Sequence, residues 1–318
     1  MQQLLTPARS LIVPVYRNEA GIDALVEAVQ AMSQASGGDF EAIFVVDGSP
    51  DASLARLRER LPTALFASTL VSLSRNFGAF AAIREGLNHA RGRAMAVMAA
   101  DLQEPPELAL QMFDTLLTDQ ADVVFGVRTG RDDPTASRLM SSLFWRAYRR
   151  WVNPDIPVGG VDIFAVSAPF RERLLAMNES NSSLLAQLFW LGGRRATVEY
   201  RRAAREHGTS AWTLSKKLRY LMDSVFAFTD LPVRVLIAAG LAGLALSTVL
   251  GGAIVVAKLA GWVSVPGYAA IMLGVLFFGA FNSLGLGIVG NYAWRAYENT
   301  KARPLAVVQS SIRFNHQE

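Results

Sequence analysis

The stretch AMAVMAADLQEPPE, residues 94–107, marks the point where a buried strand ends and a polar loop begins. Small and apolar side chains fill its first half and predict a short buried strand. Pro105 and Pro106 prevent that strand from continuing, because proline lacks the backbone N–H of a sheet ladder. Asp101 lies at the strand end, and no lysine or arginine occurs within seven positions of it on either side. A salt bridge with a sequence neighbour therefore does not explain its carboxylate.

Strands of this kind alternate with helical segments through roughly the first two hundred residues. Short apolar runs predict the strands, and apolar residues at helical spacing predict the segments between them. This alternation is typical of βαβ units, so we expect an α/β domain with a mainly parallel, Rossmann-like sheet. The strands are expected at 10–16, 41–46, 69–73, 94–99 and 121–127, and the helices at 20–35, 52–60, 79–90 and 108–117.

Polar side chains follow each of the five predicted strands. A lone aspartate after a strand is most often a helix cap or a turn residue, and we expect Asp51 to be such a cap. Five polar strand ends are harder to explain in this way, because ligands of parallel sheets bind beyond the carboxyl ends of the strands. These residues are Tyr16, Asn18 and Glu19, then Asp47 and Ser49, then Arg75 and Asn76, then Asp101 and Gln103, and finally Arg128.

The composition excludes several classes of protein. The chain has 318 residues, no cysteine and three histidines, so disulfide scaffolds, thiolate chemistry and multi-histidine metal centres are not supported. Its N-terminus, MQQLLTPARS, lacks the order of a signal peptide. No GxGxxG follows a strand and no GxxxxGK[ST] occurs, which argues against dinucleotide oxidoreductases and P-loop enzymes. Nothing indicates a nucleic-acid partner.

The apolar residues gather in the last third of the chain. Residues 235–257 carry no charge, and neither does 259–294, so 235–257 and 268–290 are each long enough to span a bilayer, which takes about 20 residues. Between them Gly261, Pro266 and Gly267 break the helix. We expect a transmembrane hairpin of two helices. Two buried core helices of a soluble domain are the alternative.

Flanking charge predicts how this hairpin is oriented. Nine lysines and arginines lie between Arg194 and Arg234 and four follow the second span, whereas the loop of the hairpin holds only Lys258. The positive-inside rule therefore places the N-terminal domain in the cytoplasm. Residues 214–226 have apolar side chains at helical spacing opposite lysines and arginines, which predicts an amphipathic helix in the membrane interface. An ordinary packed surface helix is the alternative.

The chemistry of the strand ends points to phosphate and a hard cation. Asp101, with Gln103 as a second oxygen ligand, suits Mg²⁺ or Mn²⁺, which is often held by one or two carboxylates and by the phosphates of a substrate. Arginines are well suited to binding phosphate oxygens, and Arg128, Arg131 and Arg138 follow the fifth strand. Without any family, these features predict a cytoplasmic ligand-binding domain fixed to a membrane.

Five motifs, in this order, resemble family-2 glycosyltransferases with a GT-A fold: VPVYRNEAGI, VVDGSPD, LSRNFGAFAAIREGL, ADLQEPPEL and FGVRTGRDD. The tail FGAFNSLGLGIVGNYAWRAYENTKARP and the two spans are similar to the polyprenyl-phosphate branch, which includes GtrB-type enzymes and dolichol-phosphate mannose synthases. The resemblance covers roughly residues 9–310. The sequence lacks the QxxRW motif of processive synthases, which share the GT-A domain.

The resemblance implies a role for several strand-end residues. Pro14, Tyr16 and Glu19 match the nucleotide-binding turn of the family, and Asp47 matches an aspartate that contacts uracil or ribose. Asp101 matches the metal-binding acid of the D-x-D motif and Gln103 the glutamine ligand that follows. The first acid of that motif is replaced by Ala99, which removes a contact to metal or ribose.

The resemblance also implies an acceptor site and a closing loop. Arg128, Arg138 and Ser142 are expected to bind the acceptor phosphate, although Arg138 would fit a solvated helix face equally well. Asp162 matches an aspartate near the acceptor that orients the sugar or acts as a base, and a role in a strand–turn is the alternative. In REHGTSAW, residues 205–212, Arg205 and Ser210 are expected to belong to a loop that closes over the donor.

The expected reaction is transfer of a hexose from a nucleotide sugar, best guessed as UDP-glucose, to undecaprenyl phosphate with inversion and with Mg²⁺ or Mn²⁺. UDP-GlcNAc, UDP-Gal and GDP-Man are alternative donors, and a catalytically silent membrane scaffold is the alternative to an enzyme. Relatives suggest a homo-oligomer in the bacterial inner membrane, multi-pass, with its catalytic domain in the cytoplasm. We divide the chain into a GT-A domain (1–205), an active-site loop with an amphipathic interfacial helix (206–232), two transmembrane helices (233–294) and a cytoplasmic tail (295–318).

Overall fold

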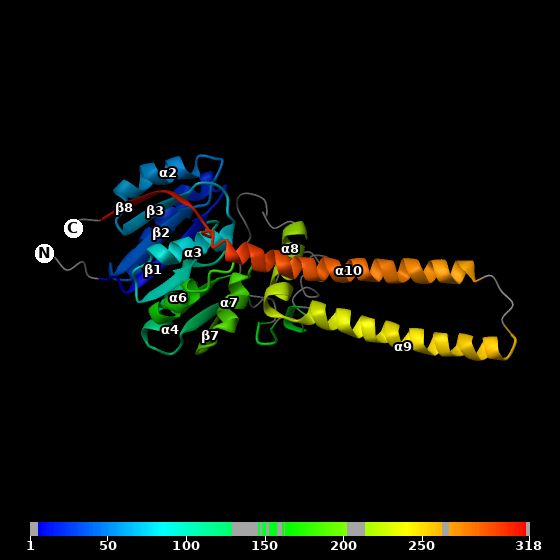
Figure 1. Cartoon of the computed structure of the whole chain (residues 1–318). Coiled ribbons are helices and arrows are strands. Elements are labelled where there is room, and N and C mark those ends of the chain that lie inside the picture. The colour runs from blue at the N-terminus through cyan, green and yellow to red at the C-terminus, as the bar shows by residue number, and fades with distance from the viewer. Residues whose placement is uncertain are drawn as a thin grey trace.

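The computed structural model has a globular α/β part from which two long helices project side by side (Figure 1). It describes residues 6–128, 146, 148–150, 153–157, 161, 163–201, 214–262 and 267–315. The five expected strands and four expected helices of the N-terminal part are all present, so this part of the prediction is confirmed.

An eight-stranded mixed sheet forms the centre of the globular part. Its spatial order is β7-β5-β6-β4-β1-β2-β3-β8. The pairs β1–β2, β1–β4, β2–β3 and β5–β7 are parallel, whereas β4–β6, β5–β6 and β3–β8 are antiparallel. The strands are β1 (Arg9–Val15), β2 (Phe40–Val46), β3 (Ala67–Leu73), β4 (Ala94–Val97), β5 (Val123–Arg128), β6 (Phe164–Ser167), β7 (Arg195–Tyr200) and β8 (Val308–Phe314).

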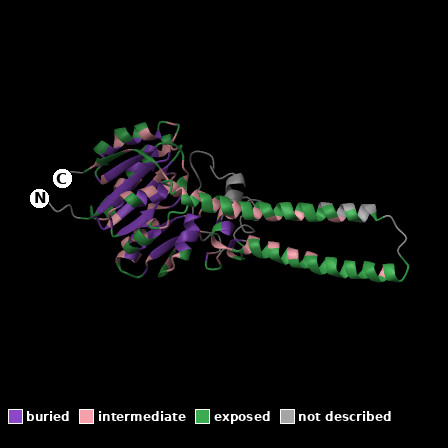
Figure 2. Cartoon of the chain, viewed as in Figure 1, coloured by how far each residue is buried: buried purple, intermediate pink, exposed green. Residues whose placement is uncertain are grey.

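Helices cover both faces of the sheet, and this explains why its central strands are apolar on both sides. Along β1, Leu11 packs into the core beside α1, α2 and α4, whereas the next residue, Ile12, packs into the core beside α3, α6 and α7. Figure 2 shows this buried centre in purple. A strand buried on both faces reads as a continuous apolar run, as parallel strands usually do. The helices are α1 (Ile22–Ala35), α2 (Ser53–Arg60), α3 (Ala79–His89), α4 (Pro106–Leu117), α6 (Ala168–Leu175) and α7 (Leu184–Trp190).

The strand order changes direction beside β1. From β1 the chain builds outward through β2 and β3, and it then returns to place β4 on the other side of β1. A crevice forms outside the carboxyl ends of the strands at such a switch point, and ligands of α/β sheets bind there. The fold therefore places the ends of β4, β1 and β2 where a ligand is expected.

The C-terminal segment returns to the sheet and forms its eighth strand. β8 pairs with β3 in antiparallel register, with Ile312 opposite Leu70, and the backbone N–H of Ser74 donates to the carbonyl of Val307 at 2.9 Å. The division of the chain into a GT-A domain (1–205) and a C-terminal tail (295–318) stays a prediction, and residues 308–314 of that tail lie in the sheet beside β3. A seven-residue strand at one end of the chain carries too little periodic signal to be distinguished from a tail.

A buried carboxylate connects four segments at the amino ends of the strands. Glu41 of β2 is 2% exposed and accepts hydrogen bonds from Ser10 Oγ at 2.7 Å and from the backbone N–H of Arg91 at 2.7 Å. The guanidinium of Arg91 pairs with it at 2.6 Å, and that of Arg313 on β8 lies 3.6 Å away. Glu41 thereby fixes β1, the start of β4 and the C-terminal strand to β2.

The two long helices are α9 (Leu231–Leu259) and α10 (Tyr268–Thr300), and the expected spans 235–257 and 268–290 lie within them. Among the described residues, α9 alone is found to be long and apolar enough to cross a membrane, with a mean hydropathy of 2.0. None of its apolar window is buried in the chain, unlike the core helix of a soluble domain. The second span and the transmembrane hairpin stay predictions.

Near their bases the two helices contact each other and the globular part. A Cβ added to Gly285 of α10 would lie 3.5 Å from Leu236 Cδ1 of α9, so the side chain of Leu236 packs against the helix at this glycine. Arg295 of α10 donates to Asp223 Oδ1 at 2.7 Å and to the carbonyl of Asn181 at 3.2 Å. These bonds hold α10 against the globular part.

The helix expected in the membrane interface is α8 (Leu214–Phe228), and its second half packs on protein. Val225 and Phe226 are buried, and Tyr148 donates to Ser224 Oγ at 3.0 Å from a fully buried position. Tyr220 and Leu221 pack against the core beside α3, so part of the apolar face is covered by protein rather than left for lipid, whereas Met222 is 42% exposed. The spacing alone could not distinguish the two surroundings, because both favour an amphipathic helix. The side chains of 214–219 lie outside the described set.

We predict that Arg91→Ala destabilises the chain strongly, because it leaves Glu41 buried without its bidentate partner. Removing one partner of a buried ion pair costs about 3 kcal/mol or more. Differential scanning fluorimetry of the full chain in detergent should show a midpoint lower by roughly 6 °C or more, at about 2 °C per kcal/mol.

Arg313→Ala is the matched control, since this guanidinium is more exposed and lies farther from Glu41. Its effect should stay below about 1 kcal/mol. Equal shifts for the two variants would contradict the role assigned to Arg91.

Candidate functional site

The polar residues predicted at the ends of β1, β2 and β4 come together at one edge of the sheet. These three strands are neighbours and parallel, so their carboxyl ends are adjacent. Asn18 connects two of them, because its Nδ2 donates to the carbonyl of Ala100 at 2.8 Å. Arg17 connects the third, because its backbone N–H donates to Ser49 Oγ at 2.8 Å. The sequence prediction of a shared site is thus supported by the geometry of the loops.

Tyr16 presents an aromatic ring at this edge. Its side chain leaves the end of β1 and is 37% exposed, with the guanidinium of Arg17 at 5.5 Å from the ring centroid. Pro14, two residues earlier, lies within β1 opposite Val45 of β2. An exposed aromatic face beside a sheet edge can stack on a nucleobase, and this face lies next to the end of β2.

The carboxylates of Glu19 and Asp51 each accept a backbone N–H from the loop of the other residue. Glu19 Oε2 accepts the N–H of Ala52 at 2.8 Å, and Asp51 Oδ2 accepts the N–H of Glu19 at 3.1 Å. Asp51 also accepts from Ser49 Oγ at 2.6 Å and from the N–H of Ser53 at the start of α2. Burial alone would raise the pKa of Asp51, but these hydrogen bonds outweigh it and lower the pKa. The N-cap of α2 is Ala52, so Asp51, which was predicted to be the cap, accepts the N–H of Ser53 from one position earlier. Glu19 has a structural task beside any contact with nucleotide.

Asp47 joins β2 to the loop that begins α3. Its two carboxylate oxygens accept the backbone N–H groups of Phe77 at 2.7 Å and Gly78 at 2.8 Å, and Asn76 Nδ2 donates to its carbonyl at 3.2 Å. The residue is 2% exposed. Burial raises the pKa of this carboxyl, against the lowering effect of the two N–H donors and of Arg75. Asp47 is therefore first of all an anchor for the α3 loop, and contact with a nucleotide would use its remaining lone pairs.

Gly48 allows this loop to come close. Its φ is +55°, and an added Cβ would lie 2.2 Å from the backbone carbon of Arg75. Only glycine fits a position with both constraints. Arg75 in turn stacks its guanidinium on the ring of Phe77, 4.0 Å from the centroid. The β2–α2 turn and the β3–α3 loop thus form one continuous surface next to Asp47.

Asp101 and Gln103 lie on a tight turn after β4. Leu102, between them, has a φ of +52°, and its N–H points to the carbonyl of Ala99 at 3.4 Å. A left-handed leucine costs about 1 kcal/mol, and such strain concentrates at functional sites. The N–H of Gln103 donates to Asp101 Oδ1 at 3.4 Å. Asp101 is half-buried and Gln103 is 8% exposed.

The donor set of this turn fits a hard cation that also binds substrate. One carboxylate and one amide oxygen are the ligand types of Mg²⁺, and among the residues that the structure describes no group of three His, Cys, Asp or Glu could hold a metal. A cation at Asp101 would therefore take its other ligands from water or phosphate oxygens. Ala99 contributes no side-chain ligand.

The remaining predicted site residues are placed farther away or lie outside the described part. Arg128 ends β5, opposite Tyr200 of β7, and the antiparallel strand β6 separates β5 from β4. Adjacent strands lie about 4.8 Å apart, so Arg128 is on the same edge but roughly 10 Å from the β4 end. Asp162, Arg138, Ser142, Arg205 and Ser210 lie outside the described residues.

Sequence reasoning noticed Asn18 and Ser49 as polar strand-end residues but missed what they do. Each bonds to the backbone of another loop, which no sequence pattern announces. It also missed the positive φ of Leu102, since leucine gives no signal for a left-handed position. Asn76 was likewise noticed as a polar strand-end residue, but its hydrogen bond to the carbonyl of Asp47 was not.

Comparison with known proteins gives matches over nearly the whole chain. The family model described as glycosyl transferase family 2 matches residues 10–175. CsbB of Bacillus subtilis (strain 168), whose assignment as a glycosyltransferase is itself provisional, is 33% identical over 302 residues, which is 95% of this chain and 91% of that protein. The prophage bactoprenol glucosyl transferase homolog of Escherichia coli (strain K12) is 28% identical over 305 residues, 94% of this chain and 98% of that protein.

Two further matches extend this picture. The SfII prophage-derived bactoprenol glucosyl transferase of Shigella flexneri is 29% identical over 311 residues, 96% of this chain and 99% of that protein. Among solved structures, the mannosyltransferase PcManGT from Pyrobaculum calidifontis, in complex with GDP-Man and Mn²⁺, matches with 18% identity and a TM-score of 0.46, covering 92% of this chain and 88% of that one. A structural match at this level supports no argument about function.

We predict that Asp47→Asn lowers the stability of the chain even without nucleotide. The amide keeps the volume but provides one acceptor where Phe77 and Gly78 need two, and a buried donor left unsatisfied costs about 1–3 kcal/mol. Thermal unfolding should show the loss, and hydrogen exchange should be faster at these two amides.

Asp39→Asn is the control, because Asp39 accepts a single N–H, that of Ala8, at the other end of the sheet. Unchanged stability of Asp47→Asn together with weakened binding of uridine diphosphate would show that Asp47 acts on ligand alone.

Proposed function

Because the chain belongs to glycosyl transferase family 2 and is a glycosyltransferase, we propose that it transfers a hexose from a nucleotide sugar to a polyprenyl phosphate. The observation that carries this proposal is the meeting of the β4, β1 and β2 ends, which gathers Tyr16, Asp47 and Asp101 at one edge of the sheet. The relatives named bactoprenol glucosyl transferase, which match along nearly their full length, support the lipid acceptor and a glucose donor.

The proposed donor is UDP-glucose. The exposed ring of Tyr16 is placed to stack on the base, with Pro14 beneath it in β1. Asp47 and Glu19 hold the two loops that border the base, and each keeps free lone-pair directions for a contact to uracil or ribose. Their scaffolding bonds make this pocket preorganised, which lowers the entropy lost on binding.

Asp101 and Gln103 are proposed to hold Mg²⁺ or Mn²⁺. The half-buried carboxylate and the neighbouring amide are on one turn, and the strained Leu102 between them fixes that turn. A bound cation would neutralise charge on the leaving diphosphate. With alanine at position 99, the protein supplies a single acid from this motif, so the diphosphate itself would supply much of the coordination.

The proposed chemistry is a single displacement with inversion. An acceptor phosphate oxygen forms a bond to the anomeric carbon while the bond from that carbon to the diphosphate oxygen breaks, and the electron pair leaves with the nucleoside diphosphate. A phosphate monoester has its second pKa near 6 and is largely dianionic at neutral pH, so it needs little help from a base. The work of the protein is then orientation and charge stabilisation.

Acceptor binding is proposed for Arg128 together with Arg138 and Ser142, and Asp162 is proposed to orient the sugar or acceptor. Arg128 is on the same edge as Asp101, roughly two strands away, which leaves room for a sugar between them. Arg205 and Ser210 are proposed to belong to a segment that closes over the donor. That segment directly precedes α8 in the sequence.

The membrane arrangement is proposed to be a hairpin of α9 and α10 in a bacterial inner membrane, with the globular part in the cytoplasm. Support comes from the exposed apolar surface of α9, from the approach of Gly285 to Leu236, and from the excess of lysine and arginine on the side of the globular part. A lipid acceptor also requires a membrane-bound enzyme. A homo-oligomer is proposed from the resemblance alone.

The test is sugar transfer into the organic phase. Purified full-length protein in detergent receives undecaprenyl phosphate, Mg²⁺ or Mn²⁺, and separately UDP-Glc, UDP-GlcNAc, UDP-Gal or GDP-Man. We expect transfer from UDP-Glc, and a fall of roughly 100-fold or more in kcat/KM for Asp101→Ala, the size seen when a group that stabilises developing charge is lost. Asp114→Ala, an exposed acid on α4, is the control and should leave the rate unchanged.

The results separate the alternatives clearly. Transfer from another donor would keep the reaction class and correct the sugar. A rate that survives Asp101→Ala would contradict the metal site. No transfer from any donor, with or without Ala99→Asp, would contradict the enzyme and favour a silent scaffold.

A further inference from the structure

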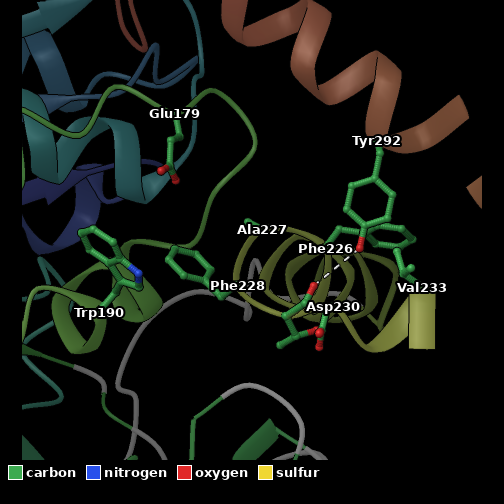
Figure 3. A pocket seen from close by; sticks show the side chains of 9 residues that line it. Glu179, Trp190, Phe226, Ala227, Phe228, Asp230, Val233 and Tyr292 are labelled. Carbon is green, nitrogen blue, oxygen red and sulfur yellow. Dashed lines mark hydrogen bonds between the residues drawn. The ribbon is translucent and has the colours of Figure 1, made fainter. Parts of the chain in front are cut away.

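A cavity of about 760 Å³ lies where the globular part meets the two long helices (Figure 3). Three parts of the chain form it: Trp190 and Glu179 come from the globular part, Phe226 and Phe228 from the end of α8, and Asp230 and Tyr292 from the bases of α9 and α10. In Figure 3 Trp190 and Glu179 lie on one side of the cavity, and Tyr292, Asp230 and Val233 lie on the other. None of these residues belongs to the strand-end site.

The position of the cavity relative to α9 indicates at which level of a bilayer the cavity would lie. Asp230 and Val233, which line it, are at the start of the helix that is apolar and exposed along its length. Trp190 is 67% exposed on the globular part beside this helix start. Tryptophan at the point where an apolar span begins is typical of the membrane interface. The cavity is therefore at the level of lipid headgroups when α9 crosses the bilayer.

The walls combine aromatic faces with negative charge. Four of the lining side chains are aromatic and two are carboxylates, and none of the described residues that line the cavity is lysine or arginine. Neither carboxylate is neutralised in a buried pair. Asp230 contacts Arg234 at 2.8 Å, but both side chains are more than 60% exposed, and Glu179 accepts a hydrogen bond from Ser182. Exposed pairs of this kind are worth little, so a competing cation can replace them.

Three arginines neighbour the lining residues without lining the cavity: Arg234 beside Asp230, Arg84 in electrostatic contact with Glu179, and Arg295. Arg295 lies over the ring of Phe226, 5.2 Å from its centroid, and pairs with Asp223 at 2.7 Å. This shows that an aromatic ring at the cavity already accepts a cation. Tyr292 contacts the edge of Phe226 and donates to the carbonyl of Thr229 at 3.5 Å. The rings of Trp190 and Phe228 are left to line the opposite wall.

We propose that this cavity binds the ammonium headgroup of an aminophospholipid such as phosphatidylethanolamine. Aromatic faces with nearby carboxylates are the surroundings that attract an organic ammonium, through cation–π and ion-pair contacts. The same carboxylates disfavour a phosphate headgroup that lacks an ammonium group, such as a phosphate monoester, relative to this zwitterion. The proposal is independent of the transfer reaction and concerns how the enzyme rests on its membrane.

Native mass spectrometry of the full chain in detergent tests this directly. The protein is titrated with phosphatidylethanolamine and, separately, with phosphatidylglycerol that has the same acyl chains. We expect specific binding of phosphatidylethanolamine, a loss of about fivefold in affinity for the double variant Glu179→Gln/Asp230→Asn, and a loss of about threefold for Trp190→Leu, since exposed ion pairs and exposed cation–π contacts are each of this order.

Matched controls remove an acid and a tryptophan elsewhere. Glu172→Gln changes an exposed acid on α6, and Trp262→Leu changes a tryptophan, 78% exposed, just beyond the far end of α9. Both should bind lipid like the unmodified chain. Phosphatidylglycerol bound as tightly as phosphatidylethanolamine, or an unaffected double variant, would overturn the proposal. An uncharged isoprenoid alcohol that displaces phosphatidylethanolamine equally from the unmodified chain and from the double variant would overturn the proposal and assign the cavity to an apolar chain instead.

Discussion

The carboxylate of Asp47 is the interaction on which the geometry of the site depends. It accepts the N–H groups of Phe77 and Gly78, and so fixes the β3–α3 loop against the end of β2. Asn18 makes the corresponding connection from β1 to the end of β4. Together with the bond from Arg17 to Ser49, these contacts join the loops after β1, β2, β3 and β4 into one rim along the edge of the sheet. A rigid rim can hold a nucleotide and a cation in a fixed relation. The acids therefore divide between two tasks: Asp47, Glu19 and Asp51 secure the rim, whereas Asp101 is the residue proposed to hold the cation.

The rim is connected to the two long helices, α9 and α10, through the globular part. Asn299 at the end of α10 accepts the N–H of Ser180 at 3.0 Å, Arg295 bonds to α8, and the chain then continues into β8 beside β3. α10 is thus bonded to the globular part at its base and through β8, the strand that follows it. In the proposed membrane hairpin, such an arrangement would hold the globular part at a fixed height above the bilayer, which suits an enzyme with one water-soluble and one lipid substrate.

Much of this could be predicted from sequence, for identifiable reasons. Continuous apolar runs such as 41–46 predict buried strands, and the strand-end position of Asp101 follows from two prolines. β8 could not be predicted, because its partner β3 is over 200 residues away and its own pattern is short. The burial of Phe226 was equally hidden, since packing on lipid and packing on protein need the same apolar face. The scaffolding roles of Asp47 and Glu19 depend on loop geometry, which motif comparison does not supply.

The most direct test is a structure of the full chain with uridine diphosphate and Mg²⁺. The central claim is that the donor binds across the ends of β4, β1 and β2. It predicts the uracil against Tyr16 and the metal bonded to Asp101 at about 2.1 Å, with diphosphate oxygens completing its shell. A nucleotide bound away from this rim, or a metal held without Asp101, would contradict the account.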